Sequence, residues 1–228
     1  SQNFLCQPAV GSAEAELMQD SEGTDNSTEE MLGEKPEFSL PTCSWKCRSG
    51  TDNGGMSVGA FSVEELESMI VVEMGAYKTA KGGRKLITWD LGSCIGIALR
   101  DPVSGVGGLL HIMLPHHTCV SKTEPFTAAK YANTGLDEMV QAIVHQGGRR
   151  EHLVAKIAGG AHMLKSVQIP ESSDISSRNL EAVEKKLGEM NIPVLASEVG
   201  GHHARTVVFE PGSGAFRIVT RGKEVKVL

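Results

Sequence analysis

The pattern that most restricts the fold is a series of short apolar runs, each ending at a glycine or proline turn. These runs cover residues 84–91, 95–100, 107–113, 153–157, 194–199, 206–210 and 215–219. Short runs rich in β-branched residues between turn residues are typical of β-strands. The turns at 101–105 and 211–214 are short, so we expect the strands on either side of each turn to form a hairpin.

Two longer segments instead have helical spacing. Residues 126–145 place Leu136, Met139, Val140 and Ile143 on one stripe before Gly147-Gly148, and a second stripe runs from Leu180 through Val183 and Leu187 to Met190. Ser176 or Ser177 is the expected N-cap of that second helix. A shorter helix is predicted within 63–74. Hairpins interrupted by two helices indicate an α+β domain with mixed or antiparallel sheets and helices packed on one face.

Charge divides the chain into two parts. Residues 1–65 carry 12 acidic and 3 basic side chains, although the whole chain has a net charge of only −6. This segment is rich in Ser, Gly, Glu, Asp and Thr, and it contains too few apolar residues to offset the entropy lost on ordering. We therefore predict a disordered acidic extension at 1–65 and a folded domain at 66–228.

Composition also excludes several classes of function. The chain has no apolar run of about 18 residues, so a membrane span is not expected. The body lacks a concentrated basic patch, which argues against nucleic-acid binding. Five cysteines at irregular spacing favour a reducing compartment over a disulfide framework. The first twenty or so residues lack the features of a secretory signal, so a cytoplasmic location is expected.

Cys94 is the first candidate for chemistry. It follows Gly92-Ser93 at a break between two predicted strands. Such a break exposes a side chain and leaves backbone N–H groups free, and a cysteine nucleophile needs such donors for an oxyanion. A free cysteine in a strand is nevertheless more often a packing residue.

His111 and Thr88 extend this candidate site. His111 lies on the strand that returns across the predicted hairpin, whose arms are about 5 Å apart. If the segment before Cys94 is extended, residues 88, 90, 92 and 94 share one face. Thr88 could then orient the imidazole, although a structural histidine and an ordinary strand threonine remain open readings.

Five groups of residues, in order, resemble the chemoreceptor glutamine deamidases (the CheD family). They are Leu91-Gly92-Ser93-Cys94-Ile95, Gly107–Pro115 with His111 followed by Lys130-Tyr131-Ala132, Lys156–Met163, Ile175–Asn179, and Val199–Gly201 with Arg205-Thr206-Val207. The resemblance covers roughly residues 69–222. It implies a sandwich fold like that of other cysteine hydrolases and the conversion of receptor glutamines to glutamates. It also implies a Cys–His–Thr site at Cys94, His111 and Thr88.

The implied reaction is acyl transfer on a cysteine, without a metal or organic cofactor. Backbone N–H groups near Gly92 and Ser93 are the expected oxyanion donors. The loop 115–125 follows the predicted His111 strand, so we expect His116 and His117 at the rim of the substrate cleft. Residues 200–205 are the less certain opposite wall. The resemblance implies that the cytoplasmic helices of chemoreceptors are the substrate.

Three residues depart from the family pattern. Asp90 replaces a small residue, often glycine, and a carboxylate near Cys94 would raise the pKa of its thiol. His162 stands where Asn is common, and Ala204 where Gly is common. Because Cys94, His111 and Thr88 are intact, these changes put substrate choice in doubt more than chemistry.

Other readings stay open. The chain could act as a docking partner of a CheC-type phosphatase, or as a cysteine hydrolase of glutamyl methyl esters or other amides. Cys43 and Cys47 have a spacing that zinc sites use, but a second ligand pair is missing, so no metal site is predicted.

Overall fold

The structure is a computed structural model that describes residues 61–117, 127–163, 174–220 and 225–228. Within these residues it has two five-stranded sheets and two main helices, which confirms the predicted α+β fold. Most of the predicted acidic extension lies outside the described residues. So do Cys6, Cys43, Cys47 and Cys119.

The first sheet has the strand order β1-β3-β8-β9-β10. Its strands are β1 (Ile70–Val71), β3 (Leu86–Leu91), β8 (Arg205–Phe209), β9 (Phe216–Thr220) and β10 (Lys226–Val227). All neighbours are antiparallel except β1 and β3. The predicted hairpin of the last two long strands is the β8–β9 pair.

The second sheet has the order β2-β5-β4-β6-β7. Its strands are β2 (Tyr77–Lys81), β5 (Val106–Ile112), β4 (Ile95–Asp101), β6 (Val154–Gly159) and β7 (Val194–Val199). Only β6 and β7 are parallel, and β4–β5 is the second predicted hairpin. Both sheets are therefore mixed, which explains why no strict alternation of strand and helix was visible in the sequence.

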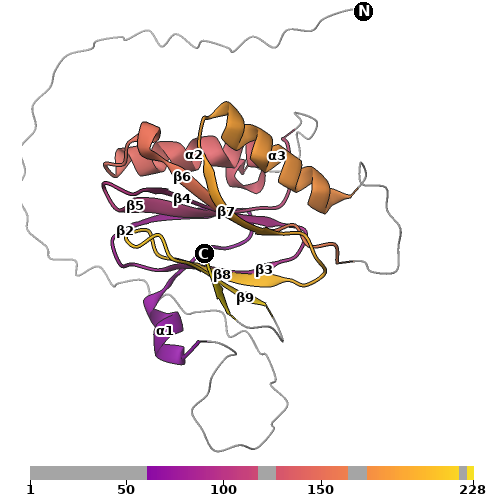
Figure 1. The fold of residues 1–228 in the computed structure, drawn as a ribbon, viewed down its shortest axis with the longest axis horizontal. Helices are drawn as coiled ribbons and strands as arrows, with labels where there is room; N and C mark the ends of the chain where they lie inside the picture. The colour runs from indigo at the N-terminus through magenta and orange to yellow at the C-terminus, as the bar shows by residue number, and fades with distance from the viewer. Residues whose placement is uncertain (1–60, 118–126, 164–173, 221–224) are drawn as a thin grey trace, which may run out of the picture. The chain divides into compact units, whose positions relative to one another are not determined.

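The two faces of the second sheet have different partners. Helices α2 (Ala132–His145) and α3 (Ile175–Glu189) cover one face (Figure 1), where Ile97, Leu110 and Leu136 belong to one buried cluster. The other face packs against the first sheet, with Ala98 and Leu109 in a second cluster. Side chains alternate along a strand, so neighbouring residues of β4 and β5 supply the two cores in turn.

The outer face of the first sheet carries a third, smaller cluster. Phe61 and Met69 pack there with Ile87 and Val208. They flank the short helix α1 (Val63–Ser68), which Ser62 caps by a capping box. Among the described residues, burial thus begins at Phe61, ahead of the predicted boundary at 65.

Several elements differ from the sequence expectations. The helix predicted within 63–74 ends at Ser68, because the chain then becomes extended and pairs with β3 as β1. The segment 126–145 begins with a 3₁₀ turn, η1 (Ala128–Lys130), before α2. The N-cap of α3 is Asp174, whose carboxylate accepts the Ser177 N–H, instead of Ser176 or Ser177. No helix within the described ranges is long and apolar enough to cross a membrane.

Candidate active site

The chain crosses from the first sheet to the second in the loop Gly92-Ser93-Cys94, between β3 and β4. Two hydrogen bonds from the segment after β6 hold this loop: Gly160 N–H donates to Cys94 O (2.8 Å) and Ala161 N–H to Gly92 O (2.7 Å). Cys94 is half-buried and joins the cluster between the sheets. The predicted strand break is therefore a crossing loop that presents Cys94 at the edge of the inter-sheet core.

Strand β3 does not keep the alternation that placed residues 88, 90, 92 and 94 on one face. Thr88 pairs with Val207 and Leu91 with Arg205, so β3 has one extra residue there, a β-bulge. Asp90 sits in the bulge with φ +55° and is exposed, whereas Thr88 and Leu91 are buried. The reasoning from alternation was wrong because the bulge turns Asp90 outward.

Thr88 and His111 are nevertheless brought together. Thr88 Oγ1 lies 2.7 Å from His111 Nδ1 and 2.8 Å from the carbonyl oxygen of Val72. The hydroxyl has one proton, which it donates to Val72 O, so it accepts from Nδ1–H. This assigns the imidazole proton to Nδ1 and leaves Nε2 as the basic nitrogen.

His111 Nε2 is buried and has no hydrogen-bond partner among the described residues. In the hairpin, His111 pairs with Gly96, and Cys94 precedes Gly96 by two residues. Cys94 packs against the inter-sheet cluster that includes Leu109, and His111, two residues after Leu109 in β5, faces the same side. The fold thus directs a basic nitrogen and a thiol into the same inter-sheet edge.

Burial sets the protonation of both groups. Burial raises the pKa of the Cys94 thiol, and the backbone amide of Cys94 opposes that rise only in part. Burial also lowers the pKa of His111 to about 4, against a smaller upward effect from the charge of Asp90. At neutral pH the site therefore rests as a neutral thiol and a neutral imidazole. The charge of Asp90 thus raises the pKa of His111. From the sequence we had expected it to raise the pKa of the Cys94 thiol.

The backbone N–H groups predicted as oxyanion donors differ in whether they already donate a hydrogen bond to another described residue. The Gly92 N–H donates to Asp90 O (2.7 Å) and is engaged within the bulge. The Ser93 amide finds no acceptor within the described part of the chain, and the Cys94 amide lies beside its own thiol. The available donors are thus the amides of Ser93 and Cys94.

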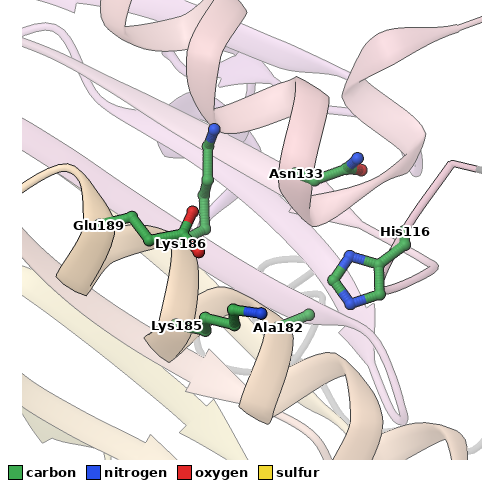
Figure 2. Close-up of a pocket in the computed structure, with 6 residues that line it drawn as sticks. All are labelled: His116, Asn133, Ala182, Lys185, Lys186 and Glu189. Atoms are coloured by element: carbon green, nitrogen blue, oxygen red, sulfur yellow. The ribbon is translucent and has the colours of Figure 1, made fainter. Parts of the chain in front are cut away.

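His116 and His117, the predicted rim residues, lie beyond the end of β5. His116 lines a pocket of about 220 Å³. Figure 2 shows it there with Asn133 of α2 and Lys185 and Lys186 of α3. The His117 N–H donates to Asn133 Oδ1 (3.1 Å), and its ring packs edge-on against Tyr131. This pocket is on the helical side of the sheet, whereas Cys94 and His111 face the other sheet. The rest of the predicted rim loop, residues 118–125, lies outside the described residues.

The predicted opposite wall, residues 200–205, does reach the crossing loop through its neighbours. The His162 N–H donates to Gly201 O (2.8 Å), and the buried Arg205 guanidinium donates to Gly159 O and Gly200 O. Next to His162, the side chain of Met163 packs beside Gly92. This wall is therefore tied to the segment that holds the Cys94 loop.

His162, one of the departures from the family pattern, belongs to the same wall. Its Nδ1 lies 2.9 Å from Asp174 Oδ2, and its carbonyl is 3.0 Å from His202 Nδ1. Across the described ranges, no group of three or more His, Cys, Asp or Glu residues has the geometry to hold a metal ion.

Comparison with known proteins gives consistent matches. Residues 113–220 match the family described as CheD chemotactic sensory transduction. The chain is 43% identical over 160 residues to the probable chemoreceptor glutamine deamidase CheD of Desulforamulus reducens, covering 70% of this chain and 95% of that one. It is 39% identical over 155 residues to the chemoreceptor glutamine deamidase CheD of Halalkalibacterium halodurans, covering 68% and 95%.

Similarity to solved structures is weaker. The crystal structure of the Bacillus licheniformis hypothetical protein YfiH matches with 14% identity and a TM-score of 0.35. The match covers 55% of this chain and 50% of that chain. A TM-score this low carries no conclusion.

Proposed function

The chain belongs to the CheD family of chemoreceptor glutamine deamidases, and we propose that it hydrolyses glutamine side chains of bacterial chemoreceptors with Cys94 as the nucleophile. The observation that carries this assignment is the orientation of His111. Its Nδ1–H is bound by Thr88, and its buried Nε2 is left without a described partner. A general base needs a fixed tautomer and a free basic nitrogen beside the nucleophile.

The reaction proceeds in two halves. His111 Nε2 takes the Cys94 proton as the sulfur attacks the glutamine Cδ, and the amide oxygen becomes an oxyanion held by the Ser93 and Cys94 amides. The C–N bond then breaks, the imidazolium returns its proton to the leaving nitrogen, and ammonia departs. A water molecule, deprotonated by His111, attacks the thioester and releases glutamate and the Cys94 thiol.

The pKa shifts favour proton transfer during attack over a preformed ion pair. Burial raises the pKa of the Cys94 thiol and lowers that of His111, so both act against a resting thiolate and imidazolium. An imidazolium forms only as the sulfur bonds to carbon, and the negative charge of Asp90 stabilises it at that moment.

The substrate is a glutamine on the cytoplasmic helices of a chemoreceptor, and the enzyme acts in the cytoplasm during chemotaxis. A glutamine on a helical bundle is presented on a convex surface. A half-buried nucleophile at a sheet edge suits such a substrate better than one at the bottom of a tunnel. The wall formed by residues 200–205 would then border the bound helix.

Mass spectrometry of a receptor cytoplasmic fragment tests the proposal. Incubation with the wild-type protein should add about one dalton at particular glutamines, because amide hydrolysis exchanges NH₂ for OH. Cys94→Ala should abolish this gain. A wild-type chain that binds the fragment and leaves every glutamine unchanged would contradict the proposal and favour the docking reading.

His111→Ala should reduce kcat nearly as far as Cys94→Ala, because the two groups act as a unit. The matched control is His145→Ala, which removes an exposed histidine at the end of α2. The control should keep wild-type kcat. Equal kcat in the His111 variant and in wild type between pH 6 and 9 would remove His111 from the mechanism.

A further inference from the structure

Asn179 lies in the first turns of α3 and is fully buried, although it is polar. Its side chain leaves the helix toward two other segments of the chain. Asn179 Nδ2 donates to Ser93 O (3.0 Å) and also to Met113 O (3.0 Å). One side chain therefore bonds both to the residue before Cys94 and to the residue just beyond the end of β5, the strand that carries His111.

The orientation of this side-chain amide is fixed by its partners. Both acceptors are carbonyl oxygens, so only the NH₂ group can face them. The other atom, Asn179 Oδ1, is buried and has no hydrogen-bond partner among the described residues. A buried acceptor without a partner costs stability. Asn179 makes its two donated hydrogen bonds at the cost of this unpaired oxygen. This cost argues against a role in packing alone.

The bond to Ser93 O also determines where the Cys94 amide points. Ser93 C=O and Cys94 N–H belong to one planar peptide, and no cis peptide is present in the described chain. In a trans peptide the C=O and the N–H point in opposite directions. The hydrogen bond from Asn179 holds the Ser93 carbonyl toward α3. The Cys94 N–H therefore points away from the helix, to the side of the Cys94 thiol.

The bond to Met113 O holds the other half of the site. The Met113 N–H already donates to Lys130 O (3.0 Å), so the peptide groups on both sides of Met113 are fixed. His111 lies two residues earlier in β5. Through Asn179, α3 thus connects the end of the histidine strand to the loop of the nucleophile.

We propose that Asn179 is a positioning residue that fixes the Cys94 amide as an oxyanion donor and holds the Cys94 loop in register with the end of β5. The inference rests on the proposed function, because an oxyanion forms only if Cys94 attacks an amide. Asn179 touches neither the substrate nor the reacting atoms. Its effect passes through the Ser93–Cys94 peptide.

The test compares Asn179→Ala with Thr134→Ala. Thr134 lies in α2, is partly buried and donates one hydrogen bond to Ala128 O (2.7 Å), and it bonds to neither Ser93 nor Met113. Asn179→Ala should lower kcat for receptor deamidation about 10- to 100-fold with little change in KM, since a misaimed donor weakens the binding of the transition state. Thr134→Ala should keep kcat within about two-fold of wild type.

A second measurement separates an effect of Asn179 on the oxyanion from an effect on the reactivity of the thiol. Alkylation of Cys94 by iodoacetamide is a displacement at carbon and forms no oxyanion, so in Asn179→Ala its rate should fall much less than kcat does. If Asn179→Ala does not fold, Asn179→Ser, which keeps one donor, should give an intermediate kcat. Equal kcat in the Asn179 and Thr134 variants would overturn the inference, and equal losses of alkylation rate and kcat in Asn179→Ala would overturn the role assigned to the oxyanion donor. A wild-type chain without deamidase activity would instead overturn the proposed function.

Discussion

At the scale of single residues, the burial of His111, the proposed base, also affects stability. Its pKa is lowered from 6.5 to about 4 in the folded protein, mainly because the ring is buried between the sheets. The unfolded chain therefore binds a proton at a higher pH than the folded one. The resulting stability is present above pH 6.5 and is lost as the pH falls from 6.5 toward 4. The same burial that keeps Nε2 unprotonated at neutral pH makes the fold sensitive to acid.

Urea unfolding at pH 7 and pH 4 measures this effect. Between pH 7 and pH 4, the free energy of unfolding should fall by about 3 kcal/mol more in the wild type than in His111→Gln, because a glutamine side chain does not titrate in this range. At pH 7 the variant should itself be less stable, because it alters the buried hydrogen bond with Thr88. Parallel pH dependence in the two proteins would show that His111 is not held neutral by burial.

Asp90 provides the second prediction at this scale. Its charge raises the pKa of His111, and its φ of +55° is a conformation that Asn also tolerates. Asp90→Asn therefore removes the charge without straining the bulge. It should shift the acidic limb of the kcat/KM profile to lower pH and reduce kcat at pH 7. Asp137→Asn, which removes a carboxylate paired with Lys186 on the helices, is the control and should shift neither.

The sequence predicted some of these residues and missed others. Cys94, His111 and Thr88 could be proposed because a glycine-flanked cysteine and a hairpin histidine fall in a family pattern. The role of Asn179 could not be proposed, because its two partners are 86 and 66 residues away and nothing in the spacing joins them. The outward turn of Asp90 was also missed, since a bulge follows from the pairing of β3 with β8, a distant segment.

At the scale of elements, alanine substitutions at two glycines should have opposite effects on stability. Gly159 ends β6 with φ +117°, and a Cβ there would lie 2.2 Å from Cys94 O. Gly188 is exposed near the end of α3, and a Cβ there would meet nothing within 4 Å. Gly159→Ala should push the Cys94 loop away, so it should cost stability and nearly all activity. Gly188→Ala should stabilise the fold by about 0.5 to 1 kcal/mol at unchanged activity.

Thermal unfolding and the deamidation assay check both variants side by side. If Gly159→Ala retains activity, the close contact between the end of β6 and the Cys94 loop is not required for activity. A lower melting temperature for Gly188→Ala would mean that this helix end does not have the open surroundings described.

The elements predicted from sequence were those with strong local patterns. The two hairpins and the two long helices were predicted because their turns and apolar stripes are visible in short windows. Strands β1, β2 and β10 were missed: β1 and β10 have two residues each, and β2 (Tyr77–Lys81) has two lysines on a sheet edge. Edge strands of this kind are defined by their partners, because charged and short strands carry little hydrophobic signal.

At the scale of the whole molecule, the site depends on where the chain changes sheets. The first sheet supplies Thr88, the second supplies His111, and Cys94 lies in the loop between β3 and β4. The proposed triad is therefore complete only when the two sheets pack face to face. Conditions that loosen the inter-sheet core should lower activity before they melt the helices.

The domain boundary gives the last prediction. The predicted boundary at residue 65 was based on charge and composition, whereas Phe61 is already buried beside Ile87 and Val208 and lies under the Arg217 guanidinium. Deletion of residues 1–60 should change the melting temperature by less than about 2 °C and leave kcat unchanged, because that segment is poor in apolar residues. In the same shortened chain, Phe61→Ala should cost about 3 kcal/mol, since it removes a fully packed ring. Differential scanning calorimetry of the full chain, the truncated chain and the truncated Phe61 variant distinguishes the two effects. A large fall in melting temperature on truncation alone would place the start of the folded domain before residue 61.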